Sequence, residues 1–169
     1  MTRPAPETVT RPAPESFRPE LAAEIIAAGA GEEGALLPLL HALQAAFGCV
    51  PDPAISMLAE ALNQTRADVY GVVGFYRDFR REPAGRRVLK LCRAEACQAM
   101  GGEALAAQAR AALGVDWDET TRDGQLTLEA VYCLGLCATA PAALLDGQPV
   151  GRLTRERLLA LLDAAREPA

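Results

Sequence analysis

The chain has 169 residues, of which 50% are hydrophobic and 5% aromatic, and its formal net charge at pH 7 is −5. The hydrophobic content excludes a disordered protein, the lack of a run of about 18 apolar residues excludes membrane insertion, and five cysteines cannot all pair in disulfides. We therefore expect a cytoplasmic protein. In that reducing compartment, clustered cysteines usually bind metal or carry out redox chemistry.

The chain begins with a proline-rich tail, in which the segment Thr-Arg-Pro-Ala-Pro-Glu occurs at residues 2–7 and again at 10–15. The tail lacks the apolar stretch that a secretory signal needs. Two copies are too few for a repeat architecture, and proline at this density favours an extended chain. We predict a disordered tail over residues 1–16.

Residues 17–84 are predicted to form a small bundle of four short helices. Asp52 is expected to cap the third helix ahead of Pro53, and Thr65 with Asp68 resembles a capping box at the start of the fourth. The apolar stripes that indicate the four helices are Leu21, Ile25 and Ile26; Leu36, Leu40, Leu43 and Phe47; Ile55, Leu58 and Leu62; and Val69, Val72, Val73 and Tyr76.

A basic segment, residues 77–93, follows the helices. It carries seven basic and two acidic residues, a sum of +5, whereas residues 1–76 (four basic, nine acidic) and 94–169 (six basic, eleven acidic) each sum to −5. Acidic flanks would repel the phosphates of a nucleic acid, so we predict no nucleic-acid binding. A protein docking surface or a solvated linker is the better interpretation of this segment.

Residues 85–169 are predicted to form an α/β domain, because near Gly85 the helical period gives way to short strands. Thr154 is expected to cap the last helix. The remaining predicted elements are a strand over 88–92, a helix over 104–113, strands near 117–121 and 126–132 around the Asp123-Gly124 turn, and strands near 142–145 and 150–153 around the Asp146-Gly147 turn.

Four of the five cysteines form two pairs, Cys92 with Cys97 and Cys133 with Cys137, each directly after a predicted strand. Loops at strand ends could turn the four thiolates toward one point. Structural zinc usually takes pairs separated by two residues, whereas wider loops suit the larger footprint of an iron–sulfur cluster. The spacing therefore favours a [2Fe–2S] cluster, with a zinc site and a redox dithiol as alternatives.

Other residues that could carry chemistry are given no site role. Cys49 stands apart from the pairs and is expected to be a small buried hydrophobic residue. His41, the only histidine, lies within a helical pattern. The glycines of Gly71-x2-Gly74 and of Gly101-Gly102 lack the spacing of a nucleotide-binding loop. We predict no catalytic residue in this chain.

The cysteine pattern, with Asp123-Gly124-x-Leu126-Thr127-Leu128-Glu129 before the second pair and Ala140-Pro141 after it, resembles the thioredoxin-like [2Fe–2S] ferredoxin family. That family includes the 24 kDa subunit of respiratory complex I. Further matching segments, which extend the resemblance over about residues 35–165, are Leu37-Pro38-Leu39-Leu40, Phe47-Gly48-Cys49-Val50-Pro51 and Val73-Gly74-Phe75-Tyr76. The resemblance implies an N-terminal helical bundle, a C-terminal thioredoxin-like domain and one [2Fe–2S] cluster bound by Cys92, Cys97, Cys133 and Cys137.

Two stretches, from Cys92 to Gly101 and from Val131 to Gly135, are most similar to the gamma subunit of NAD-dependent, molybdenum-containing formate dehydrogenases. This similarity implies an electron-transfer subunit without catalysis of its own. The expected partners are an FMN- and NAD-binding diaphorase subunit and a catalytic subunit with a molybdenum cofactor, both with further Fe–S clusters. The alternatives are the 24 kDa-type subunit of complex I, a subunit of a NAD-reducing hydrogenase, a stand-alone ferredoxin and a zinc-stabilised interaction module.

Small residues near the cysteines are expected to support the cluster. Gly101, Gly102 and Gly135 would let the backbone approach the sulfur atoms closely, and Arg93 would add positive charge near them.

Overall fold

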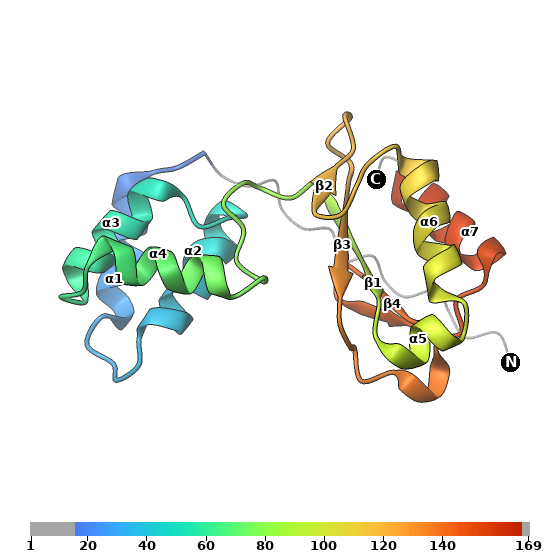
Figure 1. The fold of residues 1–169 in the computed structure, drawn as a ribbon. Coiled ribbons are helices and arrows are strands. Elements are labelled where there is room, and N and C mark those ends of the chain that lie inside the picture. Colours follow the sequence, from blue (N-terminus) through green and yellow to red (C-terminus); the bar gives the residue numbers. More distant parts are fainter. Residues whose placement is uncertain (1–15, 167–169) are drawn as a thin grey trace, which may run out of the picture. The chain divides into compact units, whose positions relative to one another are not determined.

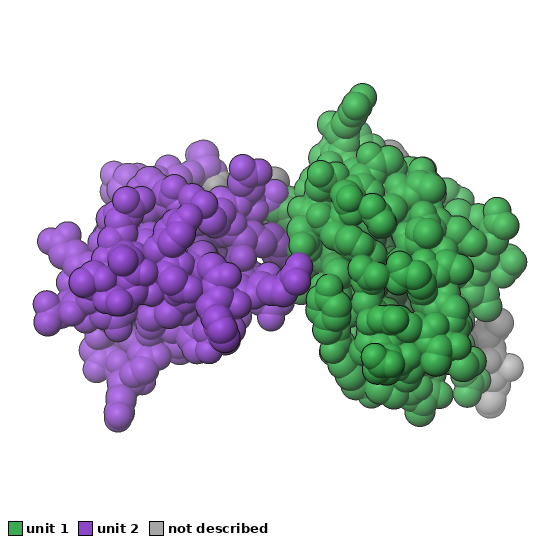
Figure 2. Space-filling view, viewed as in Figure 1, with its two compact units in different colours: residues 1–12, 84–169 green, residues 13–83 purple. Residues whose placement is uncertain are grey.

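The computed structural model describes residues 16–166, which divide at residues 83 and 84 into two compact units, each with its own hydrophobic core (Figures 1 and 2). We call residues 16–83 the helical unit and residues 84–166 the α/β unit. Residues 1–15 of the predicted tail lie outside the described residues. The mixed helix-and-sheet fold class predicted from the sequence is confirmed.

The helical unit consists of four helices, which correspond to the four predicted apolar stripes, except that Tyr76 of the fourth stripe is the extended residue after the last helix. They are α1 (Pro19–Gly29), α2 (Leu36–Phe47), α3 (Asp52–Ala61) and α4 (Arg66–Phe75). Their apolar faces meet in one core, whose fully buried large side chains are Leu40, Leu43, Phe47, Val50, Ile55, Leu58 and Val69. The segment after α4 is tied to this unit by Gln44, whose side chain donates to the carbonyl of Asp78 (2.6 Å) and accepts from the N–H of Arg80 (2.7 Å).

Of the two helix caps predicted in the helical unit, one is confirmed and the other is wrong. Thr65 and Asp68 form the capping box, in which Thr65 Oγ1 accepts from the N–H of Asp68 (3.1 Å) and Asp68 Oδ2 accepts from the N–H of Thr65 (3.2 Å). Pro51, not Asp52, is the N-cap of α3. The Asp52 carboxylate instead accepts two hydrogen bonds of 3.0 Å from Arg81 Nη2, an interaction distant in sequence.

The α/β unit is built on a five-stranded mixed sheet with the order β2-β3-β1-β4-β5. Its central strands β1 and β3 are parallel, with Cys92 opposite Val131 at their carboxyl ends, and the other neighbours are antiparallel. The strands are β1 (Arg87–Cys92), β2 (Glu119–Thr120), β3 (Leu126–Val131), β4 (Ala143–Leu145) and β5 (Gln148–Val150).

Helices α6 (Gly102–Leu113) and α7 (Arg155–Arg166) pack on one face of the sheet (Figure 1). Alternate residues of the central strands, such as Leu89 and Leu128, pack against Leu105 and Leu158 of these helices. The hydroxyl of Thr154 accepts from the N–H of Arg157 (3.3 Å), which confirms the predicted cap of the last helix.

The elements of the α/β unit differ from the prediction in several places, and α6 starts two residues earlier than expected. A short helix, α5 (Glu95–Ala99), lies between the first two cysteines where none was predicted, and β2 is shorter than expected. Strand β5 starts at Gln148, directly after the turn, and not at Val150. None of the helices in residues 16–166 combines the length and the apolar character that a membrane crossing requires.

Candidate functional site

The topology of the sheet brings the two cysteine pairs to one edge. Because β1 and β3 are parallel, their carboxyl ends lie side by side, and the chain that follows each strand carries one pair. Cys92 is the last residue of β1 and Cys97 lies on α5, whereas Cys133 follows β3 and Cys137 begins a 3₁₀ turn, η1 (Cys137–Thr139). Figure 1 shows α5 and the loop after β3 at the same end of the unit.

The four predicted site residues lie close enough to interact with one another. The Sγ atoms of Cys133 and Cys137 are 4.0 Å apart, and Cys97 interacts with both Cys92 and Cys137. Cys92 and Cys97 are buried, whereas Cys133 and Cys137 are exposed. The buried pair packs with Ala142, and the apolar side chains around this small cluster are Ala94, Val131, Leu134, Leu136 and Ala140.

The surroundings of Cys97 and Cys137 disfavour the charged form of these two thiols. Burial raises the pKa of the Cys97 thiol, and its hydrogen bond with Cys92 raises it further. A hydrogen bond with Cys133 raises the pKa of Cys137, and the charge of the neighbouring thiolate adds to the effect. Thiolates crowded in this way repel one another, so a positively charged group is needed to hold them deprotonated.

The distance within the exposed pair suits a shared metal atom. Two sulfur atoms bound at about 2.3 Å to one tetrahedral ion are about 3.8 Å apart, which is close to the 4.0 Å between Cys133 and Cys137. In the part of the chain that the structure describes, no three His, Cys, Asp or Glu side chains surround a single point as the ligands of one ion would. The arrangement is therefore two adjacent thiol pairs.

Backbone geometry supports the second pair. The N–H of Gly135 lies 3.3 Å from Cys133 Sγ, so the expected close approach of the backbone to sulfur is present at this glycine. Cys133 has a φ of 135°, which L side chains rarely adopt, and Gly135 has a φ of 72°. An N–H group directed at sulfur stabilises a thiolate, so this local conformation favours ligand chemistry at Cys133.

At the first pair, glycine serves a different contact from the one expected. A Cβ atom at Gly102 would lie 2.6 Å from the carbonyl oxygen of Cys97 and 3.5 Å from its Cβ. Gly102 thus lets α6 begin directly against the backbone of Cys97 and makes no approach to sulfur that the structure records. Gly101 has a φ of 87° and makes the turn into α6.

Arg93 holds the first cysteine loop in place. Its backbone N–H donates to the carbonyl of Val131 (2.7 Å), and its own carbonyl accepts from Gln98 Nε2 (2.7 Å). Its guanidinium donates to Glu103 (2.7 Å) and lies 5.1 Å from the ring centre of Trp117. The carboxylate of Glu103 thus offsets part of the positive charge expected from Arg93.

Sequence reasoning missed Gln98, whose amide closes the loop between Cys92 and Cys97. Its place directly after the second cysteine was the available signal. The two residues given no site role lie in the helical unit. Cys49 is 6% exposed, as expected of a small core residue, and the ring of His41 packs 4.8 Å from that of Phe79.

Comparisons with known proteins agree with this geometry. The sequence profile of the thioredoxin-like [2Fe–2S] ferredoxin family matches residues 22–166. A subunit of the NADH-quinone oxidoreductase of Mycobacterium tuberculosis (strain H37Rv) is 33% identical over 165 residues, which cover 94% of this chain and 66% of that protein. The chain thus spans slightly less than two thirds of this relative.

Two further proteins are similar over most of this chain. A subunit of the NADH-quinone oxidoreductase of Rhizobium meliloti (strain 1021) is 39% identical over 132 residues, which cover 78% of this chain and 79% of that protein. The crystal structure of a NAD⁺-reducing [NiFe]-hydrogenase in the air-oxidised state matches with a TM-score of 0.67 and 27% identity, over 78% of this chain and 22% of the hydrogenase chain.

Proposed function

The chain belongs to the thioredoxin-like [2Fe–2S] ferredoxin family, and on this basis we propose that it is an electron-transfer subunit whose Cys92, Cys97, Cys133 and Cys137 hold one [2Fe–2S] cluster. The observation that carries the proposal is the meeting of two thiol pairs beyond the parallel strands β1 and β3. Each iron of such a cluster takes two cysteine sulfurs, so two adjacent pairs fit it in number and chemistry.

The surrounding residues prepare the thiols for this role. A [2Fe–2S] cluster, when bound, takes up and releases one electron at a time. The Gly135 N–H offsets negative charge at Cys133, and the apolar side chains around Cys92 and Cys97 keep water from the buried pair. Arg93, through its bonds to Val131, Gln98 and Glu103, keeps the first loop in register with the second.

The proposed partner is a flavin- and NAD-binding subunit. Hydride transfer to or from NAD moves two electrons, whereas an iron–sulfur centre moves one, and a flavin such as FMN converts between the two. NADH-quinone oxidoreductase and NAD⁺-reducing hydrogenase, by their names, both react with this nucleotide. The chain would therefore act beside the flavin and would not bind NAD itself.

For the parent enzyme we propose a cytoplasmic NAD-dependent formate dehydrogenase with a molybdenum-containing catalytic subunit. The support is the similarity of residues 92–101 and 131–135 to the gamma subunits of such enzymes. The second candidate is a complex I-type NADH:quinone oxidoreductase or a NAD-reducing hydrogenase, which the names of the relatives favour.

Substitution of single cysteines tests the cluster. We expect Cys92→Ser, Cys97→Ser, Cys133→Ser and Cys137→Ser each to reduce bound iron and sulfide to less than about half, because each removes one of four ligands. Cys49→Ser is the matched control and should keep both in full. The measurements are iron and sulfide per chain, the visible spectrum, and the S = 1/2 EPR signal after reduction.

Two results would contradict the assignment. Full iron and sulfide in any of the four variants would remove that cysteine from the ligand set. Tightly bound zinc without visible absorption or an EPR signal in the wild-type chain would favour the zinc-stabilised interaction module.

Purification of the tagged chain from its own host tests the parent enzyme. Formate-dependent reduction of NAD by an assembly that contains molybdenum and flavin is the expected result. Oxidation of NADH by quinone, or reduction of NAD by hydrogen, without formate activity would assign the chain to one of the alternative complexes. A chain that isolates alone, with its cluster, would be a stand-alone ferredoxin.

A further inference from the structure

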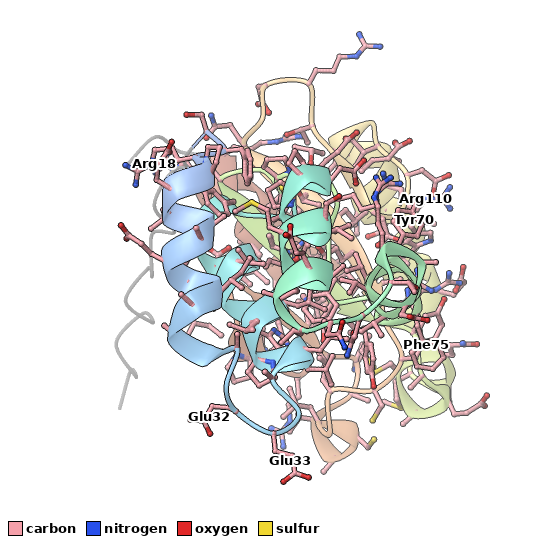
Figure 3. The ribbon with its side chains drawn as sticks, turned by 90° about the vertical axis from the view of Figure 1, so that its left-hand side faces the viewer. Arg18, Glu32, Glu33, Tyr70, Phe75 and Arg110 are labelled. Atoms are coloured by element: carbon pink, nitrogen blue, oxygen red, sulfur yellow. The ribbon has the colours of Figure 1, made fainter. Side chains whose placement is uncertain are left out.

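Helix α4 carries large aromatic side chains on the surface of the helical unit. Phe75 is 77% exposed and is the most exposed large hydrophobic side chain among residues 16–166, while Tyr70 and Tyr76 are 41% and 43% exposed. In Figure 3, Tyr70 and Phe75 lie on the side of the unit away from α1. A cluster of exposed aromatic residues is typical of a protein-binding surface.

The helix period places two glycines between these aromatic residues. At about 100° per residue, Gly74 and Gly71 lie about 40° and 100° around the helix from Tyr70, and Phe75 lies at about 140°. The buried Val69 and Val73 are on the opposite side. We call the exposed surface formed by Tyr70, Gly71, Gly74 and Phe75 the α4 face.

Neither glycine of the α4 face is explained by a contact inside the protein. A Cβ atom at Gly71 or Gly74 would have nothing within 4 Å. Glycine inside a helix is less stable than alanine, because it loses more backbone freedom on folding. The two residues therefore lower helix stability and leave the backbone of α4 without side chains between Tyr70 and Phe75, so a ridge of another protein could approach it closely.

Tyr70 is held in position before any partner binds. Its hydroxyl accepts from Arg81 Nη1 (2.8 Å), and the Arg81 guanidinium also lies 5.0 Å from the centre of the Tyr70 ring. Arg81 is in turn fixed by Asp52. A side chain that is already ordered loses little conformational entropy on binding, which suits an anchor residue at an interface.

The charges near the α4 face indicate which charges a binding partner should carry. Four arginines lie in residues 66–81, Arg66, Arg77, Arg80 and Arg81, against the carboxylates Asp68 and Asp78. Asp52, which pairs with Arg81, brings the sum for this group to +1. The Asp68 carboxylate accepts hydrogen bonds from Thr65 in the capping box. A complementary surface is therefore an apolar ridge bordered by Asp and Glu side chains.

We propose that the α4 face is the docking surface for such an acidic-bordered ridge on the flavin- and NAD-binding subunit. This inference rests on the proposed function, which supplies the partner, and adds the surface of this chain that binds it.

The test measures the dissociation constant between the full, cluster-loaded chain and the purified flavin subunit. We expect Phe75→Ser and Gly71→Leu each to weaken binding by at least about tenfold, because one removes an exposed anchor and the other blocks close approach to the helix backbone. Gly71→Leu should also raise the thermal unfolding midpoint, because leucine is the better helix former. Loss of binding in this variant could not then result from unfolding.

Matched controls place similar changes elsewhere. Ala27→Leu adds the same side chain to the exposed surface of α1, and Leu159→Ser removes a 38% exposed side chain from α7. Both should bind like the wild-type chain. Wild-type affinity should fall as salt concentration rises, because opposite charges border the interface.

Wild-type affinity in both Phe75→Ser and Gly71→Leu would overturn the proposed surface and leave the proposed function intact. A wild-type chain that does not bind the flavin subunit would overturn both. Variants that change only the self-association of the chain, measured by light scattering, would replace the flavin subunit by a second copy as the occupant and so overturn the proposal.

Discussion

Gly102 shows how one residue type connects the fold to the cysteine site. Helix α6 starts here against the backbone of Cys97, and an added Cβ would lie 2.6 Å from the carbonyl oxygen and 3.0 Å from the carbonyl carbon of that residue. These are backbone atoms, which cannot rotate away as the end of a flexible side chain can. Any side chain at this position must therefore move α5 relative to α6, and Cys97 moves with α5.

We expect Gly102→Ala to lower the free energy of unfolding of the cluster-free chain by about 1–3 kcal/mol, the usual cost of overpacking. Iron retained per chain after gel filtration should fall as well, because Cys97 is displaced. Gly31→Ala is the control, since a Cβ at Gly31 has nothing within 4 Å. Urea unfolding and iron analysis measure both effects, and an unchanged Gly102→Ala chain would show that α6 can shift without strain.

At the scale of single elements, features set by neighbouring residues could be predicted from the sequence. Features set by contacts between residues distant in sequence could not. The start of α4 was predictable because Thr65 and Asp68, three residues apart, contain the whole capping box. The N-cap at Asp52 was wrong because its carboxylate pairs with Arg81, 29 residues away. Helix α5 has only five residues and therefore no repeated apolar period.

The features of the cysteine site also fall into those that the sequence could predict and those that it could not. The spacing of the cysteines could predict the two pairs, and the strands before them could predict their place at the sheet edge. The φ of 135° at Cys133 and the hydrogen bond from Gln98 to the Arg93 carbonyl could not be predicted, because neither residue type implies such a geometry. The meeting of the pairs depends on the pairing of β1 with β3, which is a long-range contact.

The capping box of α4 gives a prediction for this element. Thr65→Ala should lower the free energy of unfolding by about 1 kcal/mol, the usual effect of losing an N-cap side chain, whereas Thr65→Ser should restore it. Urea unfolding followed by far-UV circular dichroism measures both variants. Equal stability of Thr65→Ala and wild type would mean that core packing alone sets the start of α4.

The same cap makes stability depend on pH. Hydrogen bonds from Thr65 hold the pKa of the Asp68 carboxyl below its usual value. A lowered pKa stabilises the folded chain at a pH above the ordinary carboxyl value, and this contribution is lost as the pH falls through the lowered pKa. The difference in stability between wild type and Asp68→Asn should therefore shrink on acidification.

On the scale of the whole molecule, the chain has two separate cores joined by a short segment. Arg81 is bound to Asp52 and Tyr70 of the helical unit, whereas the N–H of Gly85 donates to the hydroxyl of Thr127 in the α/β unit. Only residues 82–84 lie between these anchor points. A boundary of this kind is typical of domains that fold on their own, as the sequence predicts for residues 17–84 and 85–169.

A protease site inserted between Pro83 and Ala84 tests independent folding. After cleavage, we expect the fragment that begins at Ala84 to keep its iron and visible spectrum and the other fragment to keep its helical circular dichroism. Each should unfold in its own cooperative transition. Loss of iron or of helical signal on cleavage would mean that each unit needs the other.

The unequal exposure of the two cysteine pairs also bears on how the site is filled and how it is damaged. Cys92 and Cys97 are enclosed, whereas Cys133 and Cys137 are at the surface, so the folded chain is accessible from the side of the second pair. Iron and sulfide delivered to the proposed cluster site would enter from there without unfolding the chain. Oxygen and peroxide have the same access, and exposed thiolates are the first to be oxidised to sulfenic and sulfinic acids. Cluster assembly and oxidative damage thus both occur from the exposed side of the site. A partner that covers Cys133 and Cys137 after assembly would also protect them from oxidation.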